Sequence, residues 1–183
     1  MSKAFIIALK EEVNNIDNIN GYPVLFSGIG KINATIGTHE LIRMGVSEII
    51  NIGSCGSTQH QLGEIIKIGK VCQDIDCSPI CEYGITAFEE SQPYILLDEN
   101  SSHTCFTTDY FYDHHQKEKY APNYINMIES SSVFDMELYA IAKTCLKKNI
   151  KLSSYKWVSD DGDFSKWMEN CEVSLKKVMT LLT

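Results

Sequence analysis

The chain alternates short apolar runs with stretches whose apolar residues recur at helical spacing. A short apolar run bounded by turn-forming residues is typical of a strand, and an apolar residue every three or four positions is typical of an amphipathic helix. On this basis strands are predicted at residues 4–9, 24–27, 48–52, 65–72, 102–107 and 155–158. Helices are predicted at residues 11–19, 31–44, 136–148 and 170–182.

This alternation predicts an α/β fold with a mixed, largely parallel sheet that is covered on both faces, and hence three α/β/α layers. No internal repeat, low-complexity tract or linker interrupts the pattern, which favours a single domain over residues 1–183. Residues 74–100 have little periodicity and are interpreted as a long surface loop of the kind that often binds a ligand. Residues 113–124 look similar. Their His114 and His115 are interpreted as solvated, with a place near a ligand as the alternative.

Composition narrows the range of partners. The 183 residues are 44% hydrophobic and 22% charged, which is enough apolar content for a full core. The net charge of −8 argues against a nucleic-acid partner, because neutralising phosphates requires clustered lysine and arginine. No apolar run reaches membrane-spanning length, and the first one is too short for a secretory signal. We therefore expect a cytoplasmic protein with a small-molecule partner and no membrane contact.

Seven cysteines are many for a chain of this length. Without an export signal they are interpreted as reduced thiols, several of them buried as small apolar side chains. Cys72, Cys77 and Cys81, with His103 as a fourth ligand, are close enough in sequence to suggest a metal site. Their spacings of five and four residues do not match a structural zinc knuckle, so we expect neither a metal nor a cofactor.

The strongest chemical signal follows the last predicted strand, where Ser159 and Asp160 lead into further carboxylates. Strands of an α/β sheet present ligand-binding side chains at their carboxyl ends. Taken alone, an aspartate at this position is more often a helix N-cap or loop residue than a catalytic one. Glu11 and Glu12 follow the first predicted strand in the same way, and the alternative there is a favourable charge at a helix start. Of these two, Glu12 is the candidate to activate a water molecule.

Two more predicted strands end in glycine-rich turns, at residues 27–34 and 51–57. Backbone N–H groups in such turns can approach an oxygen-rich ligand closely, although neither turn fits the dinucleotide or P-loop pattern. Met136 and Glu137 open an otherwise apolar helix, and a buried glutamate needs a partner. Glu137 is either a cap for free amides or a carboxylate that holds a sugar diol, with Met136 packed on the sugar.

Together these segments resemble the nucleoside phosphorylase/nucleosidase superfamily, and most of all its 5′-methylthioadenosine/S-adenosylhomocysteine nucleosidases. The matches run in the family's order from residue 4 to about residue 163. Residues 8–13 are similar to A-M-x-E-E-V, residues 27–33 to S-G-I-G-K-x-N, residues 51–56 to N-x-G-S-x-G, residues 107–111 to S-G-D-x-F, residues 134–142 to V-E-M-E-x-x-A-I-A, and Ser159-Asp160 to the catalytic S-D.

The resemblance implies hydrolysis of the N-glycosidic bond of an adenine nucleoside such as 5′-methylthioadenosine or S-adenosylhomocysteine. Glu12 would activate the water, and Asp160, supported by Ser159, would protonate N7 of the purine. The other implied contacts are Ser54 and Gly56 near the water, Phe111 and the main chain of Tyr112 at the base, and Met136 and Glu137 at the ribose. Cleavage builds positive charge on the sugar, which carboxylates stabilise, and the departing purine needs a proton. Burial, or the charges of Asp161 and Asp163, would raise the pKa of Asp160 as an acid requires.

Missing arginines favour water over phosphate as the nucleophile. The family's phosphorylases hold phosphate with arginines, and one of these positions is Asn51 in this chain. The sole arginine, Arg43, falls inside a predicted helix, and Lys31 alone is a poor substitute for a bidentate arginine. A phosphorylase, a nucleosidase for another modified nucleoside, and a nucleoside-binding protein without turnover stay as alternatives.

The chain also departs from the family pattern. It is markedly shorter, and we expect the loss of a hairpin between the first predicted helix and Val24. Ser57 and Thr108 stand where the family usually has glycine. Residues 73–90 do not match closely, and this region is where the family reads the 5′ substituent and meets a second subunit. The resemblance further implies a homodimer.

Overall fold

The computed structural model describes residues 2–89 and 92–181. The strands are β1 (Ser2–Ile7), β2 (Asn18–Ile19), β3 (Tyr22–Phe26), β4 (Val46–Gly56), β5 (Ile65–Lys67), β6 (Lys70–Gln73), β7 (Ile95–Leu96), β8 (Thr104–Thr107), β9 (Val133–Asp135) and β10 (Lys151–Asp160). The helices are α1 (Lys31–Arg43), α2 (Pro122–Ser130), α3 (Leu138–Lys148), α4 (Phe164–Asn170) and α5 (Leu175–Leu181), with the 3₁₀ turns η1 (Lys10–Val13) and η2 (His114–Lys119). No helix in this described part is long and apolar enough to cross a membrane.

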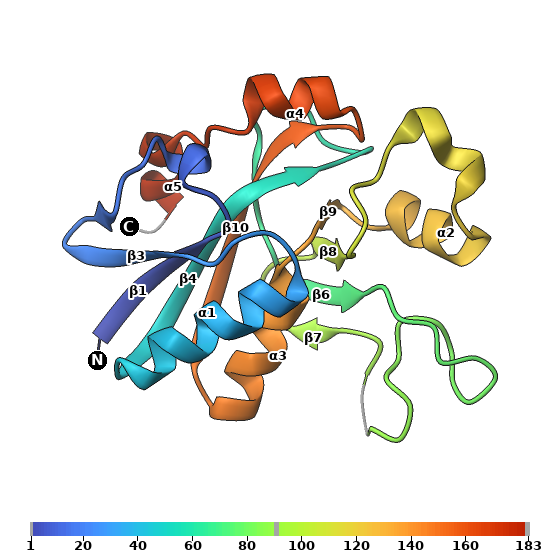
Figure 1. The fold of residues 1–183 in the computed structure, drawn as a ribbon, viewed down its shortest axis with the longest axis horizontal. Helices are drawn as coiled ribbons and strands as arrows, with labels where there is room; N and C mark the ends of the chain where they lie inside the picture. The colour runs from blue at the N-terminus through green and yellow to red at the C-terminus, as the bar shows by residue number, and fades with distance from the viewer. Residues whose placement is uncertain (1, 90–91, 182–183) are drawn as a thin grey trace.

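Parallel strands form the centre of the sheet, in the order β3–β1–β4–β10 (Figure 1). β4 pairs with β10 from Glu48 to Gly56. At Gly56 it also meets Phe134 of β9, which pairs antiparallel and starts a second limb, β9–β8–β6–β7. β5 pairs antiparallel with β10. The mixed, largely parallel sheet predicted from the sequence is therefore confirmed.

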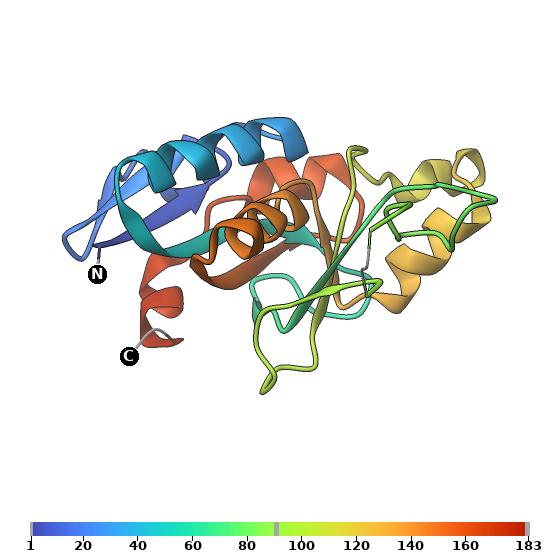
Figure 2. The same ribbon diagram turned by 90° about the horizontal axis from the view of Figure 1, so that it is seen from below.

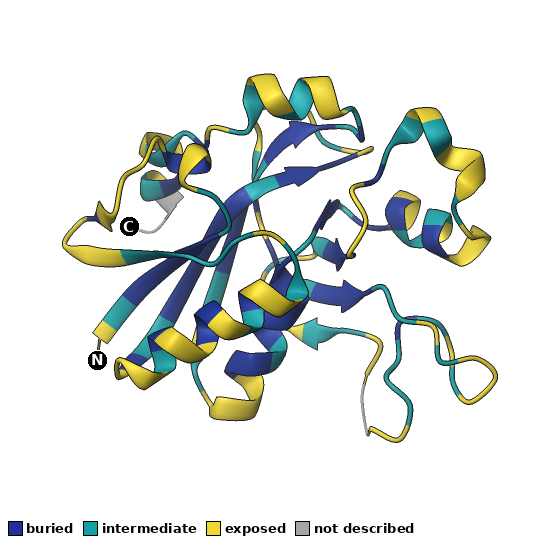
Figure 3. Cartoon of the chain, viewed as in Figure 1, coloured by how far each residue is buried: buried dark blue, intermediate teal, exposed yellow. Residues whose placement is uncertain are grey.

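The alternation of side chains along β1 explains the layers. Ala4 and Ile6 pack with residues of α1 and α3, whereas Phe5 and Ile7 pack with residues of η1 and α5. Full burial of a large apolar side chain such as Phe5 or Ile6 contributes about 1.5–3 kcal/mol to the free energy of folding. Both faces of the sheet are therefore more stable when helices cover them. Figure 2 shows α1 and α3 on one side of the sheet and α5 on the other, and Figure 3 shows that the central strands are the most buried elements. The predicted α/β/α arrangement is confirmed.

The helix predicted directly after the first strand is wrong beyond its first turn. Asn14 and Asn15 adopt left-handed backbone angles, with φ of 51° and 61°, and end η1 there. The chain then forms β2 and reverses through Asn20 and Gly21, which both have positive φ, into β3. Asn-Gly is the pair that a type I′ hairpin turn favours. A tight β2–β3 hairpin therefore follows η1, in the region where the sequence suggested that a hairpin was lost.

Three further predicted elements have other limits. β4 does not end at its glycine-rich segment but runs on to Gly56, because its backbone continues to pair with β10 there. The next predicted strand is broken at Gly69, whose N–H donates to the His103 carbonyl between β5 and β6. A Cβ on Gly69 would lie 1.9 Å from the carbonyl oxygen of Ser101, so only glycine fits. The helix predicted at residues 170–182 is replaced by α4 and α5, and residue 182 lies outside the described residues.

The loop predicted at residues 113–124 is instead η2 followed by the first residues of α2. Tyr124 and Ile128 of α2 are buried and pack with Phe106 of β8. These apolar residues anchor the helix to the second limb of the sheet. Residues 74–100 behave as predicted, because β7 is the only regular element among the described residues of that stretch.

We expect Gly69→Ala to lower the free energy of unfolding by about 1–3 kcal/mol, because the added methyl group meets a backbone oxygen that cannot rotate away. Urea denaturation followed by circular dichroism measures the change. Glu99→Ala, an exposed substitution in the neighbouring turn, is the control and should stay within about 0.5 kcal/mol of the unchanged chain. Equal stability of the two variants would contradict the close approach.

Candidate active site

A cavity of about 350 Å³ opens at the carboxyl ends of β1, β4 and β10. This volume suits a small organic ligand. The cavity is lined by Ala8, Leu9, Glu12, Ile29, Ser54, Cys55, Gly56, Thr108, Tyr110, Phe111, Tyr112, Phe134, Asp135, Met136, Glu137, Asp160, Phe164 and Trp167. Eight of the nine site residues proposed from the sequence are among them. The ninth, Ser159, lies behind the wall and contacts Asp160.

Glu12 is held at the cavity wall by hydrogen bonds to both carboxylate oxygens. η1 places its side chain against β4, where Oε1 accepts from the backbone N–H and the hydroxyl of Ser54 at 2.6 and 2.7 Å. Oε2 accepts from the backbone N–H of Leu9 at 2.9 Å. Only 3% of Glu12 is exposed. The Ser54 hydroxyl in turn accepts from Nε1 of Trp167 at 3.1 Å, which links this carboxylate to α4.

Asp160 reaches the cavity through an irregularity at the end of β10. The β4–β10 register shifts just before it, and a local bulge of this kind re-aims the side chain that follows. Oδ2 accepts from the Ser159 hydroxyl and Oδ1 from the Gly162 N–H, each at 2.8 Å. Burial raises the pKa of Asp160 in spite of these hydrogen bonds, and the charges of Asp161 and Asp163 add to the rise. A carboxyl group with a raised pKa is suited to donate a proton.

Glu137 faces the cavity from the residue before α3. It makes no capping bond to its own helix, and the backbone amide that it binds belongs to the N-cap residue of α1. Its Oε1 instead accepts from the N–H of Gly30 at 2.9 Å, across the turn that precedes α1. Burial, and then the charge of Asp135, raises the pKa of Glu137 to about 8. Near neutral pH this carboxyl group therefore has a proton to donate as well as lone pairs to accept with.

Three aromatic rings form one wall of the cavity. Phe111 lies edge-on to Phe164, with ring centroids 5.6 Å apart and planes at 83°, and edge-on to Trp167 at 6.4 Å. Phe164 and Trp167 of α4 are themselves stacked at 5.7 Å and 20°. Tyr112, by contrast, is 4% exposed and packs in the apolar cluster around α2. The wall offers flat apolar surface to a planar ligand.

A buried ion pair lies beside these groups. Nζ of Lys156 is 2.7 Å from Oδ2 of Asp135, and each side chain is 1% exposed. Burial opposes the charge of both groups. The charge of Asp135, together with that of Glu137, nevertheless raises the pKa of Lys156. Lys156, together with the Thr107 hydroxyl and the Leu138 N–H, lowers the pKa of Asp135. Asp135 also accepts from the Thr107 hydroxyl at 2.6 Å and the Leu138 N–H at 2.9 Å. A Cβ on Gly53 would lie 3.5 Å from Nζ of Lys156, close to ordinary contact distance.

The positions where the family has glycine do not need glycine in this chain. Neither Ser57 nor Thr108 has positive φ. The Ser57 hydroxyl donates to the Ser132 carbonyl at 2.7 Å, and the Thr108 hydroxyl lies 3.2 Å from Oδ2 of Asp74. Gly56 is different, because a Cβ there would lie 2.0 Å from the ring of Phe134.

The residues considered for phosphate lie outside the cavity. Asn51 is 2% exposed inside the sheet, where it accepts from the Ser154 hydroxyl and donates to the Ile6 carbonyl. Lys31 pairs with Asp109 at 2.9 Å. Within the described part of the chain, neither a lysine nor an arginine lines the cavity.

The metal site considered at Cys72, Cys77, Cys81 and His103 does not assemble. Over residues 2–89 and 92–181, the group of three or more potential ligands that does come together is a different one, at His114, His115 and Asp163. The cysteines are free thiols, and Cys55, Cys72, Cys105 and Cys145 are buried.

The phosphorylase superfamily model matches residues 18–183. The chain belongs to this superfamily. A 5′-methylthioadenosine/S-adenosylhomocysteine nucleosidase of Hydrogenovibrio crunogenus is 42% identical over 72 residues, a match that spans 37% of this chain and 29% of that enzyme. The family resemblance seen in the sequence is thereby confirmed.

Solved structures of the superfamily share the fold. A nucleosidase of the same kind from Helicobacter pylori, in complex with butyl-thio-DADMe-Immucillin-A, has a TM-score of 0.81 at 20% identity, over 100% of this chain and 98% of that one. The futalosine hydrolase of Helicobacter pylori has a TM-score of 0.77 at 20% identity, over 93% of this chain and 91% of that one. At this identity the likeness establishes the fold of the superfamily and not a substrate.

Sequence reasoning missed two residues of the cavity lining, Phe164 and Trp167, and the buried Lys156 behind it. Phe164 and Trp167 belong to a segment for which no element was predicted, and Lys156 lies inside an apolar strand. Of these, Lys156 could have been recognised from the sequence, because a lysine inside an apolar, buried strand needs a carboxylate partner.

Lys156→Met should lower the free energy of unfolding by about 3–5 kcal/mol, because it leaves the Asp135 carboxylate buried without its cation. The double variant Lys156→Met/Asp135→Asn should lose less than the sum of the two single losses, as a denaturation-based double-mutant cycle would measure. Lys117→Met, which breaks the exposed pair with Glu129, is the control and should cost less than about 1 kcal/mol. Additive losses would show that the buried charges do not depend on each other.

Proposed function

We propose that this chain hydrolyses the N-glycosidic bond of a purine nucleoside. The observation that carries the proposal is the placement of Glu12 and Asp160 on one 350 Å³ cavity in different electrostatic settings. Glu12 is surrounded by hydrogen-bond donors, whereas burial raises the pKa of Asp160. Water activation needs a base, and departure of the purine needs an acid.

In the proposed reaction Glu12 takes a proton from a water molecule held at its cavity side. The hydrogen bonds from Ser54 and Leu9 fix the carboxylate, so the attack geometry is set before the substrate binds. Asp160 gives its proton to N7 of the purine, and Ser159 and Gly162 hold its side chain in place. The negative charge of Glu12 stabilises the positive charge that develops on the sugar as the bond breaks, and the water oxygen then bonds to that sugar carbon.

The same cavity suggests where each part of the nucleoside binds. Phe111 offers its ring to the base, with the main chain of Tyr112 at the base edge, and Met136 packs on the sugar. Glu137, with its raised pKa, both accepts from and donates to the ribose hydroxyls. Ser54 and Gly56 are assigned to the region of the water, as the sequence resemblance implies.

Water is proposed as the nucleophile because the described cavity lining contains no cationic side chain to hold phosphate. The substrate is proposed to be an adenine nucleoside with a 5′-thioether, such as 5′-methylthioadenosine or S-adenosylhomocysteine. The similarity to a nucleosidase named for these two compounds supports this choice. Ile29 and Phe164 give the cavity an apolar side that suits a thioether.

We also propose that the chain acts as a homodimer. The outer face of α1 exposes Ile32 and Ile36 by 77% and 54%, and Ile29, at the start of the same stripe, lines the cavity. Large apolar side chains gathered on one exposed face are typical of a protein contact. A second subunit on this stripe would sit beside the cavity.

Adenine release from 5′-methylthioadenosine in phosphate-free buffer is the direct test. We expect release without phosphate, and Glu12→Gln and Asp160→Asn should each lower kcat by about 10²–10⁴-fold. Because Asp160 acts as an acid, kcat should fall as the pH rises through its raised pKa, and Asp160→Asn should remove that limb of the profile. Asp161→Asn, one residue away and half-exposed, is the control and should keep the limb but move it to lower pH, because the Asp161 charge contributes to the raised pKa of Asp160.

The outcomes of this assay separate the alternatives. Release only with phosphate would indicate a phosphorylase. Release of the purine base from futalosine, but from neither thioether nucleoside, would change the proposed substrate and leave the proposed mechanism standing. Tight nucleoside binding without release from any of them would indicate a binding protein.

Ile32→Lys/Ile36→Lys should convert the dimer into a monomer, because it places two charges in the proposed contact. Size-exclusion chromatography with light scattering should report half the mass of the unchanged chain. Leu146→Lys, at a position on α3 that is 62% exposed, is the matched control and should leave the mass unchanged. A monomeric unchanged chain would refute the dimer and leave the hydrolase proposal standing.

A further inference from the structure

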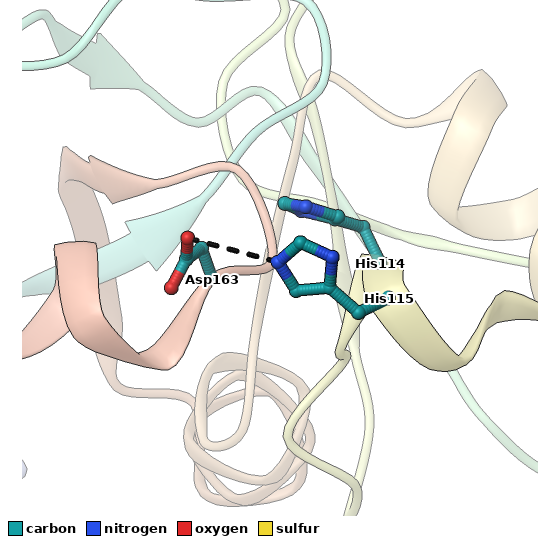
Figure 4. Close-up of side chains that lie close together, drawn as sticks. All are labelled: His114, His115 and Asp163. Carbon is teal, nitrogen blue, oxygen red and sulfur yellow. Dashed lines mark ion pairs between the residues drawn. The ribbon is translucent and has the colours of Figure 1, made fainter.

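Two adjacent histidines of η2 face the first turn of α4, outside the groups assigned to the reaction. His114, His115 and Asp163 each offer one potential ligand atom, and these atoms lie within 4.8 Å of one another (Figure 4). Nε2 of His115 is 3.9 Å from Oδ2 of Asp163. Imidazole nitrogens with a carboxylate oxygen are a ligand set that divalent transition metals favour. Nothing in the proposed hydrolysis uses this set.

Asp163 presents one free oxygen to the histidines. Its Oδ1 is occupied, because as the N-cap of α4 it accepts from the backbone N–H of Ser165 at 2.8 Å and from the Ser165 hydroxyl at 2.5 Å. This cap fixes the carboxylate and turns Oδ2 toward His115. The ligand is therefore oriented before any ion arrives.

His114 has a partner of the kind that orients a ligand histidine. Its Nδ1 lies 3.4 Å from the backbone carbonyl oxygen of Asp161 and 3.7 Å from that residue's Oδ1. Oδ1 of Asp161 is buried and has no hydrogen-bond partner. Ligand histidines typically donate their second ring N–H to a carboxylate or carbonyl, which fixes the tautomer that binds the metal. The buried, unpaired oxygen is the second observation that points to an occupied site.

We propose that His114, His115 and Asp163 bind a divalent transition-metal ion, with zinc as the first choice. Zinc holds nitrogen and oxygen ligands at about 2.0–2.2 Å, which puts tetrahedral ligands roughly 3.5 Å apart. The ligand atoms lie within 4.8 Å of one another, at most about 1.3 Å more than this, and the histidine side chains are 34% and 67% exposed, so side-chain rotations can close the site. A water molecule or a ligand group would complete the coordination.

The place of the site suggests what the ion does. His115 and Asp163 line a recess just outside the cavity, together with the ring residues Phe111 and Phe164 that the two spaces share. An ion there joins η2 to α4, and so clamps together two segments that border the entrance.

Zinc chloride titrated calorimetrically into chelator-treated chain tests the proposal without any nucleoside. We expect one ion per chain, and His115→Ala should weaken binding at least tenfold. Asp163→Asn should do the same while keeping the helix cap, because asparagine also caps well. His39→Ala, which removes an exposed histidine of α1, is the matched control and should leave the affinity unchanged.

The cysteines require a second probe, because thiols also bind zinc. Cobalt(II) bound to thiolates gives a near-ultraviolet charge-transfer band, whereas cobalt held by imidazole and carboxylate lacks it. We expect visible d–d bands without the thiolate band. Equal zinc affinity in His115→Ala and the unchanged chain, or a thiolate band that Cys77→Ser/Cys81→Ser removes, would overturn the site. Neither result depends on whether the chain is a hydrolase.

Discussion

The cavity depends on the buried pair of Lys156 and Asp135. An ion pair without solvent is stable only if its geometry is good and its remaining donors and acceptors are satisfied. Thr107 and the Leu138 N–H meet that demand, and in doing so they fix β8 and the start of α3 against β9 and β10. Glu137, the residue before α3, is therefore positioned by the pair rather than by its own helix.

The carboxyl groups around the cavity differ in the hydrogen-bond donors that reach them. Glu12 accepts three hydrogen bonds, two from Ser54 and one from the Leu9 N–H, whereas Glu137 accepts one from the Gly30 N–H. Burial raises the pKa of Glu137 to about 8, and the charge of Asp135 in the buried pair adds to that rise. The backbone thus supplies more donors to one buried acid than to the other.

Much of the site could be read from the sequence because it sits at strand ends. Glu12 and Asp160 follow apolar runs directly, and parallel strands bring their carboxyl ends to one edge whatever the details of packing. The ends of the strands were harder to predict, because the neighbouring strand determines where pairing stops. β4 continues to Gly56 because β10 runs beside it. One error was avoidable. Asn20-Gly21 is a strong hairpin signal that the periodicity of the flanking residues concealed.

What the sequence could not supply is the set of contacts made between irregular segments. Phe164 and Asp163 gain their places from the turn after Asp160, and that turn is aimed by a one-residue register shift with no local signature. His114 and His115 look like solvated loop residues until α4 is placed opposite them. The edge that carries the proposed catalytic residues is thus encoded by strand periodicity, which is local, and the packing of η2 against α4 is not. The proposed metal site therefore belongs to the part of the chain whose arrangement only the fold reveals.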